Sequence, residues 1–119
     1  MSYRFYNANP KNNYIDDCVL RSISVAEGIT WRECQSKLSR LANIEGMLLN
    51  DVEFVENYLD ERYPRFCCED TTIGEFADMC PLGNFVVTCR GHITAVLNNC
   101  IVDTFDCSDR IMWCCWKIK

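Results

Sequence analysis

Three residues of types that can form a nucleophile site occur in this chain in the order cysteine, histidine, aspartate. Cys18 follows Asp16 and Asp17, at the start of a segment whose apolar spacing is typical of a buried helix. The first turn of a helix has N–H groups without intrahelical acceptors and the positive end of the dipole, and both favour a thiolate. His92, the single histidine, lies in a strand pattern, and Asp103 lies in the next one. This order predicts a cysteine nucleophile with a histidine base and an orienting carboxylate.

The hairpin that would carry the base can be given a register. Asn98-Asn99 is a signal for a two-residue turn, which places Thr94 directly opposite Asp103. His92 and Asp103 then share a face as diagonal neighbours, within side-chain reach. Because a one-residue slip would move Asp103 to the other face, the triad depends on this register. The alternative acids are Asp106 and Asp109.

An oxyanion site can also be assigned from position in the chain. The backbone N–H of Cys18 is one candidate donor, and the amide of Asn13, or of the adjacent Asn12, is the other. Taken singly, each candidate has an ordinary structural explanation: a core cysteine, a structural histidine, a surface carboxylate or turn-forming asparagines. The combination on suitable elements is what indicates a thiol site.

The hydrophobic spacing changes along the chain from a helical period to a strand period. An irregular arm is expected over 1–15, before a helix capped by Asp16 or Asp17. Residues 1–119 are therefore predicted to form one α+β domain, with N-terminal helices packed on a C-terminal antiparallel sheet. The expected helices span about 17–27, 30–42, 51–63 and 72–80, a short strand 65–68, and the main strands 85–89, 92–97, 100–105 and 111–116. Thr30 with Glu33 and Thr72 with Glu75 predict capping boxes at two of the helix starts, and Val52, Val55 and Leu59 are the expected buried line of the third helix.

Composition limits the classes of partner. The chain is 49% hydrophobic and 24% charged, as a folded globule is, and its net charge of −5 disfavours nucleic acid as a partner. It has no run of about 18 apolar residues, so no membrane span is predicted. The N-terminus lacks an apolar signal core, and a cytoplasmic location is therefore expected.

The ten cysteines allow three states: reduced core residues, a disulfide framework or a metal site. There is no Cys-x-x-Cys spacing, and the pairs Cys67-Cys68 and Cys114-Cys115 should point to opposite faces of strands. Mostly reduced, buried cysteines are therefore expected, with no metal and no cofactor. Trp113 and Trp116, three apart in a strand pattern, should likewise point to opposite faces.

Several segments resemble small papain-like cysteine peptidase-fold proteins of bacteria and their phages. They are Asp17-Cys18-Val19-Leu20-Arg21-Ser22-Ile23, Gly28-Ile29-Thr30-Trp31, Gly91-His92-Ile93-Thr94-Ala95-Val96 and Asp103-Thr104-Phe105-Asp106, in a resemblance running from about Asn7 to Trp116. The resemblance implies a papain-like fold with Cys18, His92 and Asp103 in the catalytic positions. Papain has a glutamine six residues before its cysteine, whereas this chain has Asn12 there, and it is about half the size of papain.

The first functional hypothesis is a thiol hydrolase, a cysteine peptidase, isopeptidase or amidase that acts on a protein or peptide substrate through an acyl-enzyme. The second is a catalytically silent binding protein of the same fold, such as a phage protein that engages a host factor. A transferase using the same thioester chemistry is a third. Substrate and oligomeric state are left open by the sequence.

Overall fold

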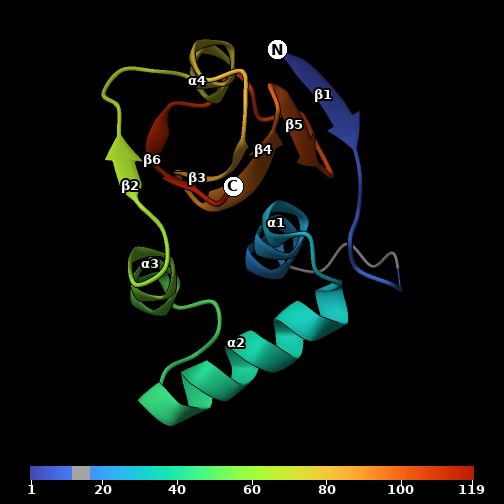
Figure 1. The fold of residues 1–119 in the computed structure, drawn as a ribbon, viewed down its shortest axis with the longest axis vertical. Helices are drawn as coiled ribbons and strands as arrows, with labels where there is room; N and C mark the ends of the chain where they lie inside the picture. Colours follow the sequence, from blue (N-terminus) through green and yellow to red (C-terminus); the bar gives the residue numbers. More distant parts are fainter. Residues whose placement is uncertain (12–16) are drawn as a thin grey trace.

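The fold is described from a computed structural model that covers residues 1–11 and 17–119. These residues form an α+β domain of four helices and a six-stranded sheet (Figure 1). None of these helices is long and apolar enough to cross a membrane. In chain order the elements are β1 (Ser2–Phe5), α1 (Cys18–Glu27), α2 (Trp31–Glu45), α3 (Val52–Asp60), β2 (Arg65–Cys67), α4 (Ile73–Met79), β3 (Asn84–Cys89), β4 (His92–Leu97), β5 (Cys100–Asp103) and β6 (Met112–Lys117).

The sheet has the order β1-β5-β4-β3-β6-β2 and separates two helical layers. Helices α1 to α3 lie on one side of it and α4 on the other (Figure 1). Four of the pairings are antiparallel, but β1 runs parallel to β5 at one edge. The prediction of an irregular arm was therefore wrong for Ser2–Phe5, and that of a purely antiparallel sheet was wrong too, because this strand obtains its hydrogen-bond partners from β5, about a hundred residues away. Residues 6–11 form no helix or strand, as predicted, and 12–15 lie outside the described residues.

The hairpin register that the triad requires is confirmed. Leu97 pairs with Cys100 and Ala95 with Val102, as the two-residue turn predicts. Asn98 and Asn99 both have positive φ, 47° and 65°, which is the conformation of the hairpin turn that matches strand twist. The β3–β4 turn at Arg90-Gly91 is also two residues long, so β4 begins at His92.

The helix boundaries follow local capping chemistry. Both predicted capping boxes are present, Thr30 with Glu33 at the start of α2 and Thr72 with Glu75 at the start of α4. Gly28 ends α1 in the left-handed conformation, at φ 74°. These signals act within a few residues, which is why the sequence predicts them well.

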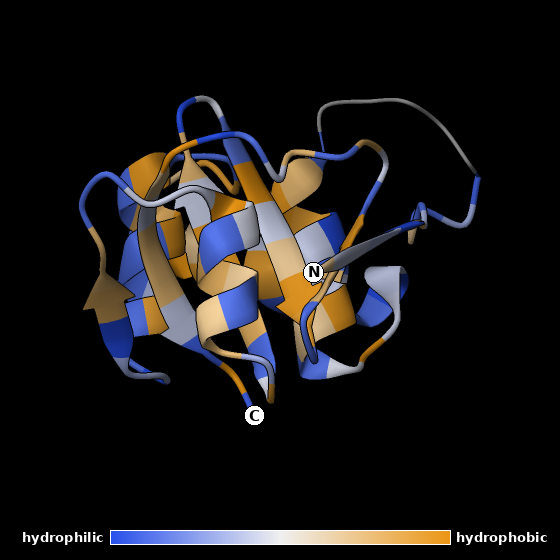
Figure 2. Ribbon diagram, turned by 90° about the horizontal axis from the view of Figure 1, so that it is seen from above, coloured by the Kyte–Doolittle hydropathy of each residue, from blue (hydrophilic) through white to orange (hydrophobic). Residues whose placement is uncertain are grey.

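The core consists of two apolar clusters, one on each side of the sheet. The larger lies between the sheet and α1 to α3, and the smaller lies under α4. Figure 2 shows the apolar residues gathered on the central strands and on the helix faces turned toward them. The predicted buried line of α3 is confirmed at Val55 and Leu59, whereas Val52 is 67% exposed and Phe54 and Tyr58 are buried as well.

Cys67 and Cys114 form a disulfide between β2 and β6. They lie directly opposite each other in the antiparallel pair, with Cα atoms 4.2 Å apart. The expectation of reduced cysteines was wrong for this pair, because β2–β6 pairing across 47 residues has no local sequence signal. The other eight cysteines lie outside the disulfide. The adjacent Cys68 and Cys115 pack in the cluster under α4, on the opposite face, as expected.

A β-bulge interrupts the pairing of β3 with β6. Val87 pairs with Cys115 and Cys89 with Met112, so Trp113 and Cys114 together oppose Thr88. The Thr88 hydroxyl lies 3.2 Å from Cys114 O, to which it donates, and 3.3 Å from Cys114 N, from which it accepts.

Because the bulge adds one residue to β6, Cys114 and the residues after it point to the opposite side of the sheet from the one that simple alternation from Met112 predicts. Trp116 is wholly buried in the cluster beside α1 to α3, and Trp113 lines a cavity on that same side of the sheet. The prediction that the two tryptophans point to opposite faces was wrong for this reason.

Candidate active site

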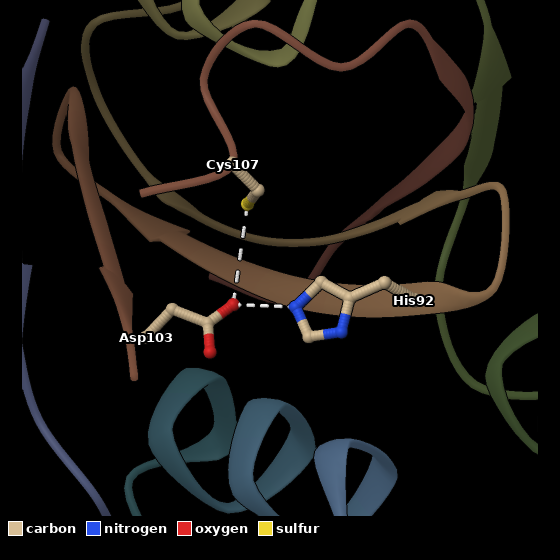
Figure 3. Close-up of side chains that lie close together, drawn as sticks. All are labelled: His92, Asp103 and Cys107. Carbon is tan, nitrogen blue, oxygen red and sulfur yellow. Dashed lines mark hydrogen bonds and ion pairs between the residues drawn. The ribbon is translucent and has the colours of Figure 1, made fainter. Parts of the chain in front are cut away.

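His92 and Asp103 form a buried pair at the ends of neighbouring strands. His92 is the first residue of β4, and Asp103 is the last of β5. His92 Nε2 lies 2.7 Å from Asp103 Oδ2, and the two side chains are only 7% and 5% exposed. Figure 3 shows the other ring nitrogen on the side of the ring away from Asp103. The carboxylate therefore fixes the ring and leaves Nδ1 available for another partner.

Further hydrogen bonds hold the Asp103 carboxylate in place. The Thr94 hydroxyl donates to Oδ2 at 2.6 Å, and the backbone N–H of Thr104 donates to Oδ1 at 2.6 Å. The Tyr3 hydroxyl, on β1, donates to the backbone carbonyl of Asp103 at 3.2 Å. The ring of Phe105 packs against His92, with centroids 4.7 Å apart. Thr94, Thr104 and Tyr3 thus hold Asp103, and Asp103 and Phe105 position the His92 ring.

These contacts shift both groups toward their charged forms. Burial lowers the pKa of His92, but side-chain hydrogen bonds with Asp103, Cys107 and Cys18, and the Asp103 charge, outweigh it and raise the pKa to about 11. Burial raises the pKa of Asp103, yet the hydrogen bonds from His92 and Thr94 hold it below its ordinary value. At neutral pH the pair is therefore an imidazolium and a carboxylate.

Cys18 is the first residue of α1 and belongs to the same site. It is a hydrogen-bond partner of His92, and both residues line one cavity. Asp17 occupies the N-cap position, but its side chain makes no cap hydrogen bond. Its buried carboxylate instead accepts from Arg21 and from Trp31 Nε1, the latter at 2.9 Å. The prediction of a carboxylate cap is thus corrected for Asp17, because these two donors, on α1 and α2, hold its side chain. Asp16 lies outside the described residues.

The cavity at Cys18 has a volume of about 450 Å³. Its walls come from α1, the start of α3, the β3–β4 hairpin and the bulge of β6. Val52 and Trp113 line this cavity and are 67% and 54% exposed, so they form an apolar rim beside Cys18 and His92. The lining residues are Cys18, Val19, Asn50, Val52, Val55, Glu56, Thr88, Cys89, Gly91, His92, Ile93 and Trp113.

Sequence reasoning missed Cys107. This wholly buried thiol lies 4.0 Å from Asp103 Oδ2, to which it donates (Figure 3). It is also a hydrogen-bond partner of His92. His92, Asp103 and Cys107 each offer an atom within 4.8 Å of the others, a set of types that can hold a metal ion. The only signal was a cysteine four residues after the acid, and nothing in the sequence indicates that this loop turns back.

The structure brings together Cys18, His92 and Asp103, the three predicted triad residues. Of the alternative acids, Asp106 accepts instead from the Ser108 N–H at 2.9 Å, and it is Asp103 that lies beside His92. The two predicted oxyanion amides, Asn12 and Asn13, lie outside the described residues.

A second, larger hollow of about 840 Å³ lies between β1 and the helices, and its lining includes Arg4, Tyr6, Trp31 and Arg32. None of the triad residues lines it. Of these two cavities, the smaller one is lined by Cys18 and His92.

Comparison with protein-family models, with curated proteins and with solved structures gives no match for this chain. The interpretation of the site therefore rests on its own geometry.

Proposed function

We propose that this protein is a papain-like thiol hydrolase that cleaves an amide or ester bond through an acyl-enzyme on Cys18. One observation carries the proposal: His92 is held by Asp103 at 2.7 Å and also hydrogen-bonds Cys18, at the wall of an open cavity. A nucleophile, a base and an orienting acid in contact are the arrangement that thiol catalysis requires.

The roles follow from the protonation of the pair. The imidazolium of His92 stabilises a thiolate on Cys18, and the thiolate attacks the carbonyl carbon of the substrate. His92 then gives its Nδ1 proton to the leaving amine or alcohol, and the C–N or C–O bond breaks. Water attacks the thioester while Nδ1 takes up its proton, which releases the acid and restores the thiol site. The N–H groups of the first turn of α1 would stabilise the oxyanion.

We also propose that the fold is similar to that of papain-like proteins. A helix that starts with the cysteine, packed on strands that carry the histidine and the acid, is the arrangement that the resemblance to papain-like proteins implies. Site geometry supports this more strongly than the fold class does, because one fold class serves many functions. Peptidase, isopeptidase and acyl-transfer activities share this first half-reaction.

Trapping of the acyl-enzyme tests the proposal. Peptide thioesters and peptide vinyl sulfones would be incubated with the reduced protein, and modified cysteines would be located by mass spectrometry. We expect the peptide thioester to acylate Cys18 with release of its thiol, and the vinyl sulfone to alkylate Cys18 by addition. Neither modification should occur at this position in Cys18→Ala. Cys100→Ala is the matched control, because this half-buried thiol is on β5, away from the cavity, and donates to Ile101 O.

Turnover that survives in Cys18→Ala, or modification at a different cysteine, would contradict the proposal. A Cys18 that reacts with none of these reagents would instead favour the alternative of a non-catalytic binding protein. The exposed Val52 and Trp113 at the cavity rim are the surface that such a protein would use.

A further inference from the structure

The proposed hydrolase mechanism leaves one buried nucleophilic group at the site unused. Cys107 is wholly buried, faces both members of the His92–Asp103 pair and takes no part in acyl transfer. Soft thiolate, imidazole and carboxylate are the three ligand types that Zn²⁺ prefers in proteins. The presence of all three around one point calls for an explanation beyond packing.

The distances between the donor atoms are near those of a metal site. Zinc bonds of about 2.0–2.3 Å at tetrahedral angles put N and O ligands about 3.4 Å apart and S and O ligands about 3.6 Å apart. Here His92 Nε2 is 2.7 Å and Cys107 Sγ is 4.0 Å from Asp103 Oδ2. Shifts of a few tenths of an ångström in each side chain would therefore admit the ion.

The surroundings also suit a metal ligand set. Thr94 and the Thr104 N–H hold the Asp103 carboxylate with hydrogen bonds that a bound ion leaves intact. A Cys107 thiolate and the Asp103 carboxylate would balance the two charges of the ion in a site where unpaired charge is costly. His92 also lines the open cavity, so one of the three ligand residues borders solvent-accessible space.

We propose that His92, Asp103 and Cys107 bind a divalent cation of the Zn²⁺ class. Binding displaces the Nε2 proton of His92 and the thiol proton of Cys107 to solvent. This binding proposal stands independently of the proposed hydrolase function.

Titration of the reduced, chelator-treated protein with Co²⁺ tests the binding step. We expect a thiolate-to-metal charge-transfer band that Zn²⁺ abolishes by displacing the Co²⁺. Cys107→Ala should weaken binding by more than the ~10–100-fold that loss of an outer partner costs. His92→Gln, at the cavity wall, should do the same and serves where Cys107→Ala does not fold. Cys100→Ala and Cys18→Ala should keep the band.

The absence of a band in the wild type, or its survival in Cys107→Ala or His92→Gln, would overturn the proposal. Loss of the band in Cys18→Ala would also overturn it, because the metal would then sit on the nucleophile. A metal-free Cys18 that does not react would refute the hydrolase function and leave the Co²⁺ result standing.

Discussion

At the scale of single residues, the site depends on how firmly Asp103 is held. Its carboxylate accepts from a ring nitrogen, a hydroxyl and a backbone N–H, all within 2.7 Å. Hydrogen bonds to a charged group are stronger than neutral ones, and they are costly to lose in a buried site. The orientation of His92 is therefore a property of this network rather than of one contact.

Thr94→Val tests the network. Valine has nearly the shape of threonine but cannot donate, so Asp103 loses one partner in a buried setting. We expect the free energy of unfolding to fall by about 1.5–3 kcal/mol, measured by urea denaturation at pH 7. Thr104→Val is the matched control, because its hydroxyl is 3.4 Å from the carboxylate and its backbone N–H is retained, and it should change stability by less than about 0.5 kcal/mol. Equal stability of Thr94→Val and wild type would show that the hydroxyl does not hold Asp103.

The proximity of His92 and Asp103 was predictable because the turn that determines it lies between them in the chain. The Asn98-Asn99 turn sets the register of β4 and β5, and register alone decides that His92 and Asp103 share a face. Cys107 escaped prediction because its approach depends on the path of the loop after β5, which has no periodic pattern. The lack of Cys-x-x-Cys spacing disfavours only zinc ligands that are close in the chain, whereas His92 and Asp103 meet through the pairing of β4 with β5 and Cys107 joins them from the loop after β5.

At the scale of elements, α1 carries Cys18 and is joined to the neighbouring helices through Glu27. This carboxylate accepts from Lys37 Nζ at 2.8 Å, from Tyr58 Oη at 2.9 Å and from Tyr63 Oη at 2.5 Å. Lys37 lies on α2 and Tyr58 on α3, so one acid joins the three helices at the end of α1 away from Cys18. Burial raises the pKa of Glu27, but these hydrogen bonds hold it below the ordinary value of 4.5.

Glu27→Gln should destabilise the protein at neutral pH and much less in acid. A lowered pKa in the folded state stabilises the fold above pH 4.5, and this contribution is lost as pH falls through the folded-state pKa. We expect a loss of about 1–3 kcal/mol at pH 7 in urea denaturation, narrowing toward pH 3. Glu61→Gln, at an exposed pair 3.5 Å from Arg62, should have little effect at either pH. A Glu27→Gln deficit that does not change with pH would contradict the assignment.

Some features of the helices and strands could be predicted from the sequence, and others could not. Capping boxes and hairpin turns are encoded within a few residues, and both were predicted. The parallel pairing of β1 with β5 and the bulge opposite Thr88 depend on partners far along the chain. The bulge matters for the site, because it turns Trp113 into the cavity beside Cys18 and His92.

At the scale of the whole molecule, the disulfide between Cys67 and Cys114 joins β2 to β6 across 47 residues. In the chain-entropy account, a loop of this length stabilises the fold by about 4 kcal/mol through restriction of the unfolded chain. We expect reduction to lower the melting temperature and Cys67→Ala to melt at that lower temperature with or without reductant. A wild-type melting temperature that reductant does not change would contradict this.

Activation of Cys18 by His92 can be measured by cysteine-resolved alkylation across pH. Native protein and His92→Ala would be treated briefly with iodoacetamide from pH 5 to pH 9, and each cysteine would be quantified by mass spectrometry, with Cys100 as the internal control. The account predicts that Cys18 is alkylated rapidly near pH ~6, where an ordinary thiol with a pKa of about 8.5 is almost wholly protonated. In His92→Ala that early reaction should vanish. Activation by His92 would be contradicted if Cys18 reacted only near the pH at which an ordinary thiol ionises, and equally in both proteins.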